Sequence, residues 1–342
     1  MSGQASLVRL RLLCCLLALL VSSRAISAQQ GLDRSRNNTA YGPGYVAATD
    51  ASAGRFEAIG TGPTQLVFIA GWGFSGDVFR EFAIKNAADY TALLVTLPGF
   101  GGTAGWPMPA DSVSHATTPW MSRSAAAVSR TMTQRGVRDA IIIGHFIVGS
   151  HVALALAQRH PEQVRGIVLA GAELSRAWPS RADTTGRTPA TAAQRAASVD
   201  RFLVPQFFRF VTDSTWHANN YLPHTFSVDS WHATRLWREQ SLVPLPVMMR
   251  YLSDFYATEF APKLDSVRAP LLIVQPGFTA HILSDPRTSY LRTFFQDSWK
   301  PAQGRTGIEI QVVPNAAVNM WLDQPDVFAA ALKKFASRTA PR

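Results

Sequence analysis

The stretch that decides the fold is Ile141-Ile142-Ile143-Gly144-His145-Phe146-Ile147-Val148-Gly149-Ser150-His151. Its first residues form a continuous apolar run, which is typical of a β-strand buried on both faces. Small residues then permit a tight turn, and residues 149–159 have the composition and length of a helix. The stretch therefore predicts a strand (residues 139–144), a sharp turn that contains Phe146, and a helix.

On both sides of this stretch, apolar runs of strand length alternate with segments of helical length. The other predicted strands are residues 65–70, 91–97, 163–170, 270–276 and 307–313. The other predicted helices are residues 75–88, 118–135, 287–299 and 325–337. Continuously apolar strands separated by helices indicate an α/β fold with a mostly parallel central sheet and helices on both faces.

Residues 173–266 interrupt this alternation, because they contain no apolar run of strand length. We expect a helical cap inserted into a core of residues 44–172 and 267–342. The cap would cover the carboxyl edge of the sheet, where open α/β sheets bind ligands. Its aromatic side chains either line a lid over the site or form the cap's own core. They are Trp178, Phe202, Phe207, Phe208, Trp216, Tyr221, Trp231, Trp237, Tyr251, Phe255 and Tyr256.

Two further segments carry a family resemblance together with the opening stretch. They are Phe68-Ile69-Ala70-Gly71-Trp72-Gly73-Phe74-Ser75-Gly76 and Leu97-Pro98-Gly99-Phe100-Gly101-Gly102-Thr103. All three resemble loops of the α/β-hydrolase fold superfamily, over about residues 60–175 and 265–337. The resemblance implies that the backbone N–H groups of Trp72 and Ile147 occupy the oxyanion-hole positions. It also implies a pocket bordered by Gly71, Trp72, His145, Phe146 and Val148.

The same resemblance places no triad residue type at the three catalytic positions. The family's nucleophile elbow reads Gly-His-Ser-x-Gly-Gly, whereas Phe146 stands here at the serine position and Val148 at the following glycine. A phenyl ring has no lone pair with which to attack a carbonyl. The acid position falls on Phe278 or Thr279, and the histidine position falls on Val318 or Asn319.

Ser150 and His281 are the alternative candidates for a nucleophile and a base. We expect Ser150 in the first turns of the helix, where it points away from the oxyanion hole. His281 is expected at the surface, at the start of a helix capped by Ser284 or Asp285. The cap histidines His217, His224 and His232 lack the spacing of metal ligands, so we expect neither a metal nor another cofactor.

Three hypotheses about function remain open at this point. The favoured one is a non-catalytic hydrolase homologue that binds an apolar small molecule or a partner in the former active-site pocket. The second is an active hydrolase of an ester or similar acyl bond with a relocated nucleophile and base. The third is a purely structural envelope protein, which would differ from the first if Phe146 filled the pocket instead of lining it.

The N-terminus predicts export. Residues 1–28 combine Arg9 and Arg11, a short apolar run and a small-residue end, as in a secretory signal peptide, and residues 29–43 read as a flexible leader. We therefore expect a secreted or periplasmic protein with no membrane span after cleavage; an uncleaved anchor is the alternative. The only cysteines, Cys14 and Cys15, would leave with the peptide.

Charge and composition narrow the classes of partner. Apolar residues make up 47% of the chain and charged residues 16%, which is an ordinary globular balance. Loss of three arginines with the signal peptide changes the net charge from +10 to +7. The arginines are scattered, whereas nucleic-acid binders show a clustered basic stripe, so we expect no nucleic-acid partner. A basic surface of this kind suits an anionic cell envelope. The residues give no signal for an oligomeric state.

Overall fold

The structure is a computed structural model that describes residues 46–108, 113–174, 191–211, 214–216, 222–258 and 261–339. The predicted signal peptide and leader lie outside the described residues, as do Trp178, His217 and Tyr221. Within the described ranges, no helix has the length and apolar character that crossing a bilayer requires.

The core of the molecule is a seven-stranded sheet in the order β1-β3-β2-β4-β5-β6-β7. Its strands are β1 (Arg55–Ile59), β2 (Thr64–Ile69), β3 (Tyr90–Thr96), β4 (Ala140–His145), β5 (Val164–Ala170), β6 (Leu271–Gly277) and β7 (Ile308–Pro314). Only β1 runs antiparallel to its neighbour. The order places β4 between β2 and β5, so the turn after β4 opens at the middle of the carboxyl edge.

The edge strand β1 was absent from the sequence-based expectation. Its five residues include Arg55 and Glu57, and none of the five is fully buried. An edge strand of this kind lacks the long apolar run by which the buried parallel strands were recognised.

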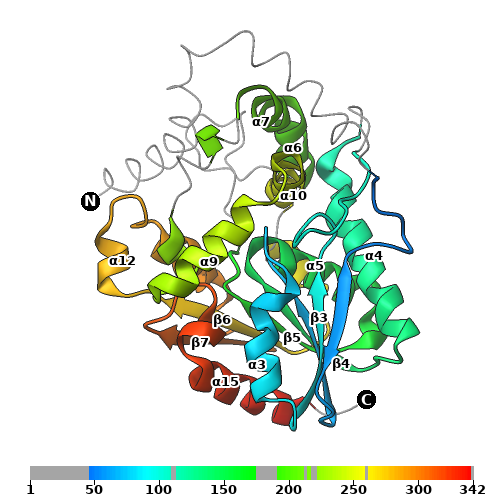
Figure 1. Cartoon of the computed structure of the whole chain (residues 1–342), viewed down its shortest axis with the longest axis vertical. Coiled ribbons are helices and arrows are strands. Elements are labelled where there is room, and N and C mark those ends of the chain that lie inside the picture. Colours follow the sequence, from blue (N-terminus) through cyan, green and yellow to red (C-terminus); the bar gives the residue numbers. More distant parts are fainter. Residues whose placement is uncertain are drawn as a thin grey trace.

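Helices cover both faces of the sheet, as the alternating pattern predicted (Figure 1). On one face α3 (Arg80–Lys85) packs on α15 (Pro325–Arg338), where the rings of Phe82 and Phe328 lie 5.3 Å apart. On the other face α4 (Pro119–Gln134) packs on α5 (Phe146–Arg159). The remaining short helices of the core are η1 (Gly76–Phe79), η2 (His115–Thr117), η3 (Pro161–Gln163), α12 (Ala280–Ser284), α13 (Leu291–Phe295), η6 (Asp297–Ala302) and α14 (Met320–Asp323).

Between β5 and β6, the described residues form helices and no strand. These are α6 (Ala192–Ser198), the π-helical η4 (Val199–Leu203), α7 (Val204–Phe210), η5 (Pro223–Thr225), α9 (Ser230–Ser241), α10 (Leu245–Ala257) and α11 (Ala261–Leu264). In Figure 1, α6, α7 and α10 stand beyond one end of the sheet, and α9 descends from them in front of it.

The sequence left open whether the aromatic residues of the cap line a lid over the site or form the cap's own core, and the structure places them in different surroundings. Phe207, Tyr251 and Phe255 are buried and belong to the main hydrophobic core, whereas Trp231 is exposed. Trp216 lies over the loop after β2, where its ring meets that of Trp72 edge-on at 5.6 Å.

Two predicted helices differ from the structure. The segment 75–88 divides into η1 and α3, and the segment 287–299 divides into α13 and η6. The second break coincides with a tertiary contact: the Nε2 of Gln296, which follows α13, donates to the carbonyl of Pro276 in β6 at 2.7 Å. The helix after β4 also begins at Phe146, three residues earlier than predicted.

Candidate functional site

The turn between β4 and α5 places Phe146 at the carboxyl edge of the sheet. Phe146 has a φ of +52°, a left-handed conformation that costs a bulky residue about 1–3 kcal/mol. Its neighbour His145 has ordinary extended angles and caps the helix. The backbone therefore forms the strained strand-to-helix elbow of the family motif, although the side chain at its tip is a phenyl ring.

Glycines around the elbow make this geometry possible. A Cβ on Gly144 would lie 2.7 Å from the Cα of Ser150, and a Cβ on Gly149 would lie 2.4 Å from the carbonyl oxygen of Ile69. A Cβ on Gly71 would meet the Cβ of Phe146 at 2.6 Å. A side chain at any of these three positions would clash with the elbow or with the loop after β2, and Val148 nearby is fully buried.

The side chain of Phe146 lies inside an aromatic cluster and is 7% exposed. We call Phe74, Phe146, Phe226, Phe278 and Phe295 the aromatic wall. The ring of Phe146 stacks on Phe295 at 5.9 Å and tilts against Phe74 at 6.5 Å. Phe226, which comes from the cap, meets the Phe146 ring edge-on at 6.5 Å. Aromatic rings at such separations attract one another beyond simple burial, so the cluster holds Phe146 in place.

His145 is fully buried behind the elbow. Its Nδ1 accepts a hydrogen bond from the N–H of Gly71 at 3.2 Å, which places the ring proton on Nε2. Rings of Phe79 and Trp321 meet the imidazole edge-on at 5.6 Å and 4.7 Å. This burial lowers the pKa of His145 to about 3. The imidazole is therefore neutral at physiological pH and serves to position the loop after β2.

The structure places the two candidate acid positions just after β6. Phe278 is buried, and its ring lies 5.8 Å from that of Phe295 in the aromatic wall. The hydroxyl of Thr279 accepts a hydrogen bond from the N–H of Ile282 and caps α12. Neither side chain offers a carboxylate to the elbow.

The two candidate histidine positions lie after β7 and pair with the cap. The N–H of Val318 donates to the carbonyl of Thr225 at 3.2 Å, and Val318 is fully buried. Asn319 donates from its backbone at 3.2 Å and from Nδ2 at 2.8 Å to the carbonyl of Phe226. The residue whose ring touches Phe146 is thus also bonded to the loop that carries the histidine in the family.

The loop after β2, for which the resemblance predicts an oxyanion-hole donor at Trp72, is held by cap helices. The indole N–H of Trp72 donates to the carbonyl of Met248 at 3.0 Å, and its carbonyl accepts from Nε2 of Gln240 at 3.0 Å. The N–H of Ser75 donates to Glu239 at 2.6 Å. The backbone N–H of Ile147 lies in the first turn of α5, where a helix offers no internal acceptor. α9 and α10 together fix the position of Trp72.

Ser150 and His281 do not come together at the elbow. Ser150 is fully buried in α5, and its hydroxyl donates to the carbonyl of Gly144 at 3.0 Å. His281 lies exposed in α12. The expected cap of that helix was wrong, since Thr279 caps it and Asp285 pairs instead with Arg287 at 2.8 Å. Arg287 also holds the pKa of the Asp285 carboxyl below its usual range.

Comparison with known families decides the wider relationship. The family model described as "Alpha/beta hydrolase family" matches residues 66–331, which is most of the chain. The chain belongs to the α/β hydrolase family. Its sheet order, elbow and intervening helices are those expected of a member.

Two proteins of similar sequence are named as esterases. The chain is 26% identical over 288 residues to a pimeloyl-[acyl-carrier protein] methyl ester esterase of Edwardsiella ictaluri, covering 81% of this chain and 95% of the relative. It is 31% identical to the protein of that name from Aeromonas salmonicida, over 44% of this chain and 56% of the relative.

Solved structures of hydrolases share the fold. A hydrolase from Pseudomonas aeruginosa has a TM-score of 0.57 at 15% identity, over 86% of this chain and 99% of that one. An esterase from Rhodococcus has a TM-score of 0.54 at 17% identity, over 86% of this chain and 98% of that one.

Two members of the aromatic wall escaped the sequence analysis. Phe226 lies in a short cap loop and Phe295 in α13, and neither belongs to a family motif or to the set of aromatic residues assigned to the lid. No pattern in the sequence marks them, because only the folded chain brings their rings to Phe146. The two rings bear on whether Phe146 lines the former pocket or fills it, because the Phe146 ring packs against both of them.

A buried polar cluster between cap and core was also missed. Asp254 of α10 accepts the N–H groups of Trp120 and Met121 at 2.8 and 2.9 Å, and so caps the start of α4. Burial raises the pKa of Asp254 to about 8. Nδ1 of His115 lies 2.8 Å from Asp200 of the cap, and burial lowers the pKa of His115. The cluster joins α10 to the start of α4 and η4 to η2.

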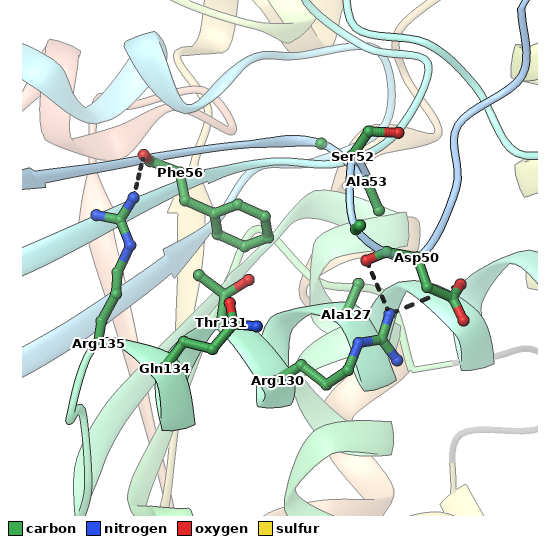
Figure 2. Close-up of a pocket in the computed structure, with 11 residues that line it drawn as sticks. Asp50, Ser52, Ala53, Phe56, Ala127, Arg130, Thr131, Gln134 and Arg135 are labelled. Atoms are coloured by element: carbon green, nitrogen blue, oxygen red, sulfur yellow. Dashed lines mark hydrogen bonds and ion pairs between the residues drawn. The ribbon is translucent and has the colours of Figure 1, made fainter.

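One surface groove of the described residues lies away from the elbow. It has a volume of about 220 Å³ and is bordered by the loop before β1 and by α4 (Figure 2). Arg130 there lies 3.7 Å from Asp50 and also donates to its carbonyl. The described part of the chain contains no group of three or more His, Cys, Asp or Glu side chains that could hold a metal ion.

Proposed function

We propose that this chain is a non-catalytic member of the α/β hydrolase family that binds an apolar small molecule against the aromatic wall. The observation that carries the proposal is Phe146, which occupies the elbow in the strained backbone conformation of a nucleophile but carries a phenyl ring. Hydrolysis of an acyl bond by the family's route requires a nucleophile, a base and oxyanion donors within reach of one another. Of these three requirements, only the oxyanion donors have a counterpart in this chain, the backbone N–H groups of Trp72 and Ile147.

The side chains of the aromatic wall indicate which kind of molecule could bind there. Phe146, Phe278 and Trp72 retain 7%, 6% and 9% exposure, so each presents a small apolar surface beneath the cap. The nearest titratable group, His145, is neutral because burial lowers its pKa to about 3. An apolar, uncharged molecule fits such surroundings, since a charged one would lose its hydration without gaining a partner.

A purely structural role is the second candidate, and the packing of Phe146 favours it. The ring contacts the cap through Phe226, whose carbonyl binds Asn319. In this role the former active site joins cap to core, and no ligand enters.

One binding experiment separates the two roles. Nile red, an uncharged apolar fluorophore, is titrated into the purified chain, into Phe278→Gln and into Ile84→Gln, which alters an exposed apolar residue elsewhere. Saturable binding that Phe278→Gln loses and Ile84→Gln keeps supports the ligand-binding proposal. Absence of saturable binding to the unmutated chain overturns it.

The structural role makes the opposite prediction for a cavity variant. Phe146→Ala then opens an apolar cavity of the kind that takes up benzene, and benzene raises the melting temperature of this variant but not that of the unmutated chain. Export of the chain stays part of the proposal, supported by the sequence of residues 1–28.

A further inference from the structure

The outward face of α9 carries an unusual set of side chains. Trp231, Arg235, Arg238 and Leu242 follow one another at spacings of four, three and four residues, which places them on one side of the helix. We call these residues the α9 stripe. The opposite side, with Ala233, Leu236 and Gln240, is buried against the core. The stripe therefore occupies the positions that an ordinary surface helix fills with polar residues.

The two apolar members of the stripe are among the most exposed large apolar side chains of the described residues. Trp231 is 65% exposed and Leu242 is 84% exposed. Eleven residues of helix separate them by about 16 Å. Single exposed apolar residues are normal on proteins. Two of them on one helix face, with arginines between them, form an extended surface instead.

Arg238 of the stripe is exposed, whereas Arg235 is half-buried and its Nε is enclosed without a hydrogen-bond partner. The guanidinium of Arg235 lies over the ring of Trp231 at 5.4 Å. Over the ranges that the structure describes, no carboxylate lies within ion-pair distance of Arg235 or Arg238. Glu239, the acid of the same helix, binds the N–H of Ser75. Asp229, at the helix start, accepts the N–H of His232.

We infer that the α9 stripe binds the surface of an anionic lipid bilayer. Tryptophan is favoured at the boundary between headgroups and acyl chains, and a leucine can enter the same layer. Arginine binds phosphate oxygens in a bidentate manner, and its stem can lie along apolar surface while the charge reaches the headgroups. The net charge expected after loss of the signal peptide, +10 − 3 = +7, adds attraction to an anionic surface.

The geometry of α9 also fixes the orientation on the bilayer. Gln240, on the side of α9 opposite the stripe, donates to the carbonyl of Trp72. Glu239, on the side next to the stripe, accepts the N–H of Ser75. A bilayer on the stripe would therefore meet the face of α9 that is turned away from its buried residues Ala233, Leu236 and Gln240. This inference stands on the stripe alone and holds whichever role the aromatic wall has.

Vesicle sedimentation tests the inference. The full chain is mixed with vesicles of phosphatidylcholine alone or with added phosphatidylglycerol. We expect binding that requires phosphatidylglycerol. Trp231→Ala with Leu242→Ala, and Arg235→Gln with Arg238→Gln, should each weaken binding about tenfold. The matched controls are Ile84→Ala with Val312→Ala, which shorten two exposed apolar side chains elsewhere, and Arg268→Gln with Arg292→Gln, which remove the same number of charges elsewhere. Each pair should change binding less than about twofold.

A second measurement reports insertion directly. Lipids brominated on the acyl chain should quench part of the tryptophan fluorescence of the unmutated chain, and Trp231→Phe should remove that part. Equal loss of sedimentation in stripe and control variants would show attraction by net charge only and would overturn the inference. Absence of binding to phosphatidylglycerol vesicles would also overturn it and would point to an acidic protein partner instead.

Discussion

Phe146 holds a backbone conformation that suits glycine or asparagine far better than phenylalanine. Its φ of +52° follows from the elbow, because β4 must turn directly into α5 beside Gly71. The side chain offsets part of this strain through its contacts with the aromatic wall. Phe146 therefore has the strained backbone conformation of the family's nucleophile elbow, although its side chain is not a nucleophile.

The strain gives a prediction on the order of two variants. Phe146→Ala and Phe146→Gly both lose the ring, which costs about 3–5 kcal/mol of the free energy of unfolding. Glycine takes a positive φ freely, so Phe146→Gly should be at least as stable as Phe146→Ala in urea unfolding. The control is Val148, whose φ is not positive. At this position the free energy of unfolding of Val148→Ala should exceed that of Val148→Gly by about 1 kcal/mol. The same order at both positions would contradict the account.

His145 makes stability depend on pH. Its folded-state pKa is about 3 against an ordinary value of 6.5, so the unfolded chain takes up a proton that the folded chain does not. This contribution is full above pH 6.5 and is lost as the pH falls toward 3. Between about pH 7 and pH 4 the loss amounts to about 3 kcal/mol.

His145→Asn should remove that dependence, because the amide keeps an acceptor for Gly71 without titrating in this range. Urea unfolding at several pH values measures the difference. His281→Gln, which alters an exposed histidine, is the control and should leave the slope unchanged. An unaltered slope in His145→Asn would show that other groups carry the acid sensitivity.

At the scale of elements, one carboxylate joins the cap loop to the loop after β7. Asp323 accepts the N–H groups of Ala317 at 2.8 Å and Val228 at 3.1 Å, and also the hydroxyl of Ser227. Asp323→Ala leaves these donors without their acceptor and should lower the free energy of unfolding by about 3 kcal/mol. Hydrogen exchange at the Val228 and Ala317 amides should accelerate.

Asp326→Ala is the matched control for this prediction. Asp326 lies three residues further on, is 87% exposed and pairs with Lys85 at the surface. Exposed pairs of this kind contribute little. If Asp323→Ala behaved like Asp326→Ala, the two loops would not depend on each other.

The sequence predicted the elements that repeat a pattern and failed where tertiary contacts decide. The six parallel strands lie within one residue of their predicted bounds, and most of them contain a continuous apolar run; β7, with Glu309 and Gln311, does not. The helix predicted at 287–299 is broken where Gln296 binds β6, a contact with no local signal. At the site, the motifs located the elbow at Phe146. The partners Phe226 and Phe295 could not be found, since their position depends on the fold of the cap and of α13.

For the whole molecule, the fold is that of the α/β hydrolase family, whereas the tip of the elbow carries the phenyl ring of Phe146. The chain covers 95% of an esterase at 26% identity and has the sheet order and elbow of the family. Fold alone does not fix activity, which depends on the groups at the site. We propose a protein that has kept the cap and the pocket architecture, lost ester hydrolysis, and lies on an anionic surface through α9.

The most direct test of this account is hydrolysis of a panel of p-nitrophenyl esters and methyl esters by the purified chain. It is measured beside the double variant Ser150→Ala, His281→Ala, which removes the alternative nucleophile and base. The account predicts no turnover above the buffer rate for either protein. Turnover by the unmutated chain that the double variant loses would show a relocated catalytic site, and turnover by both would show a site not identified here; either result would contradict the central claim.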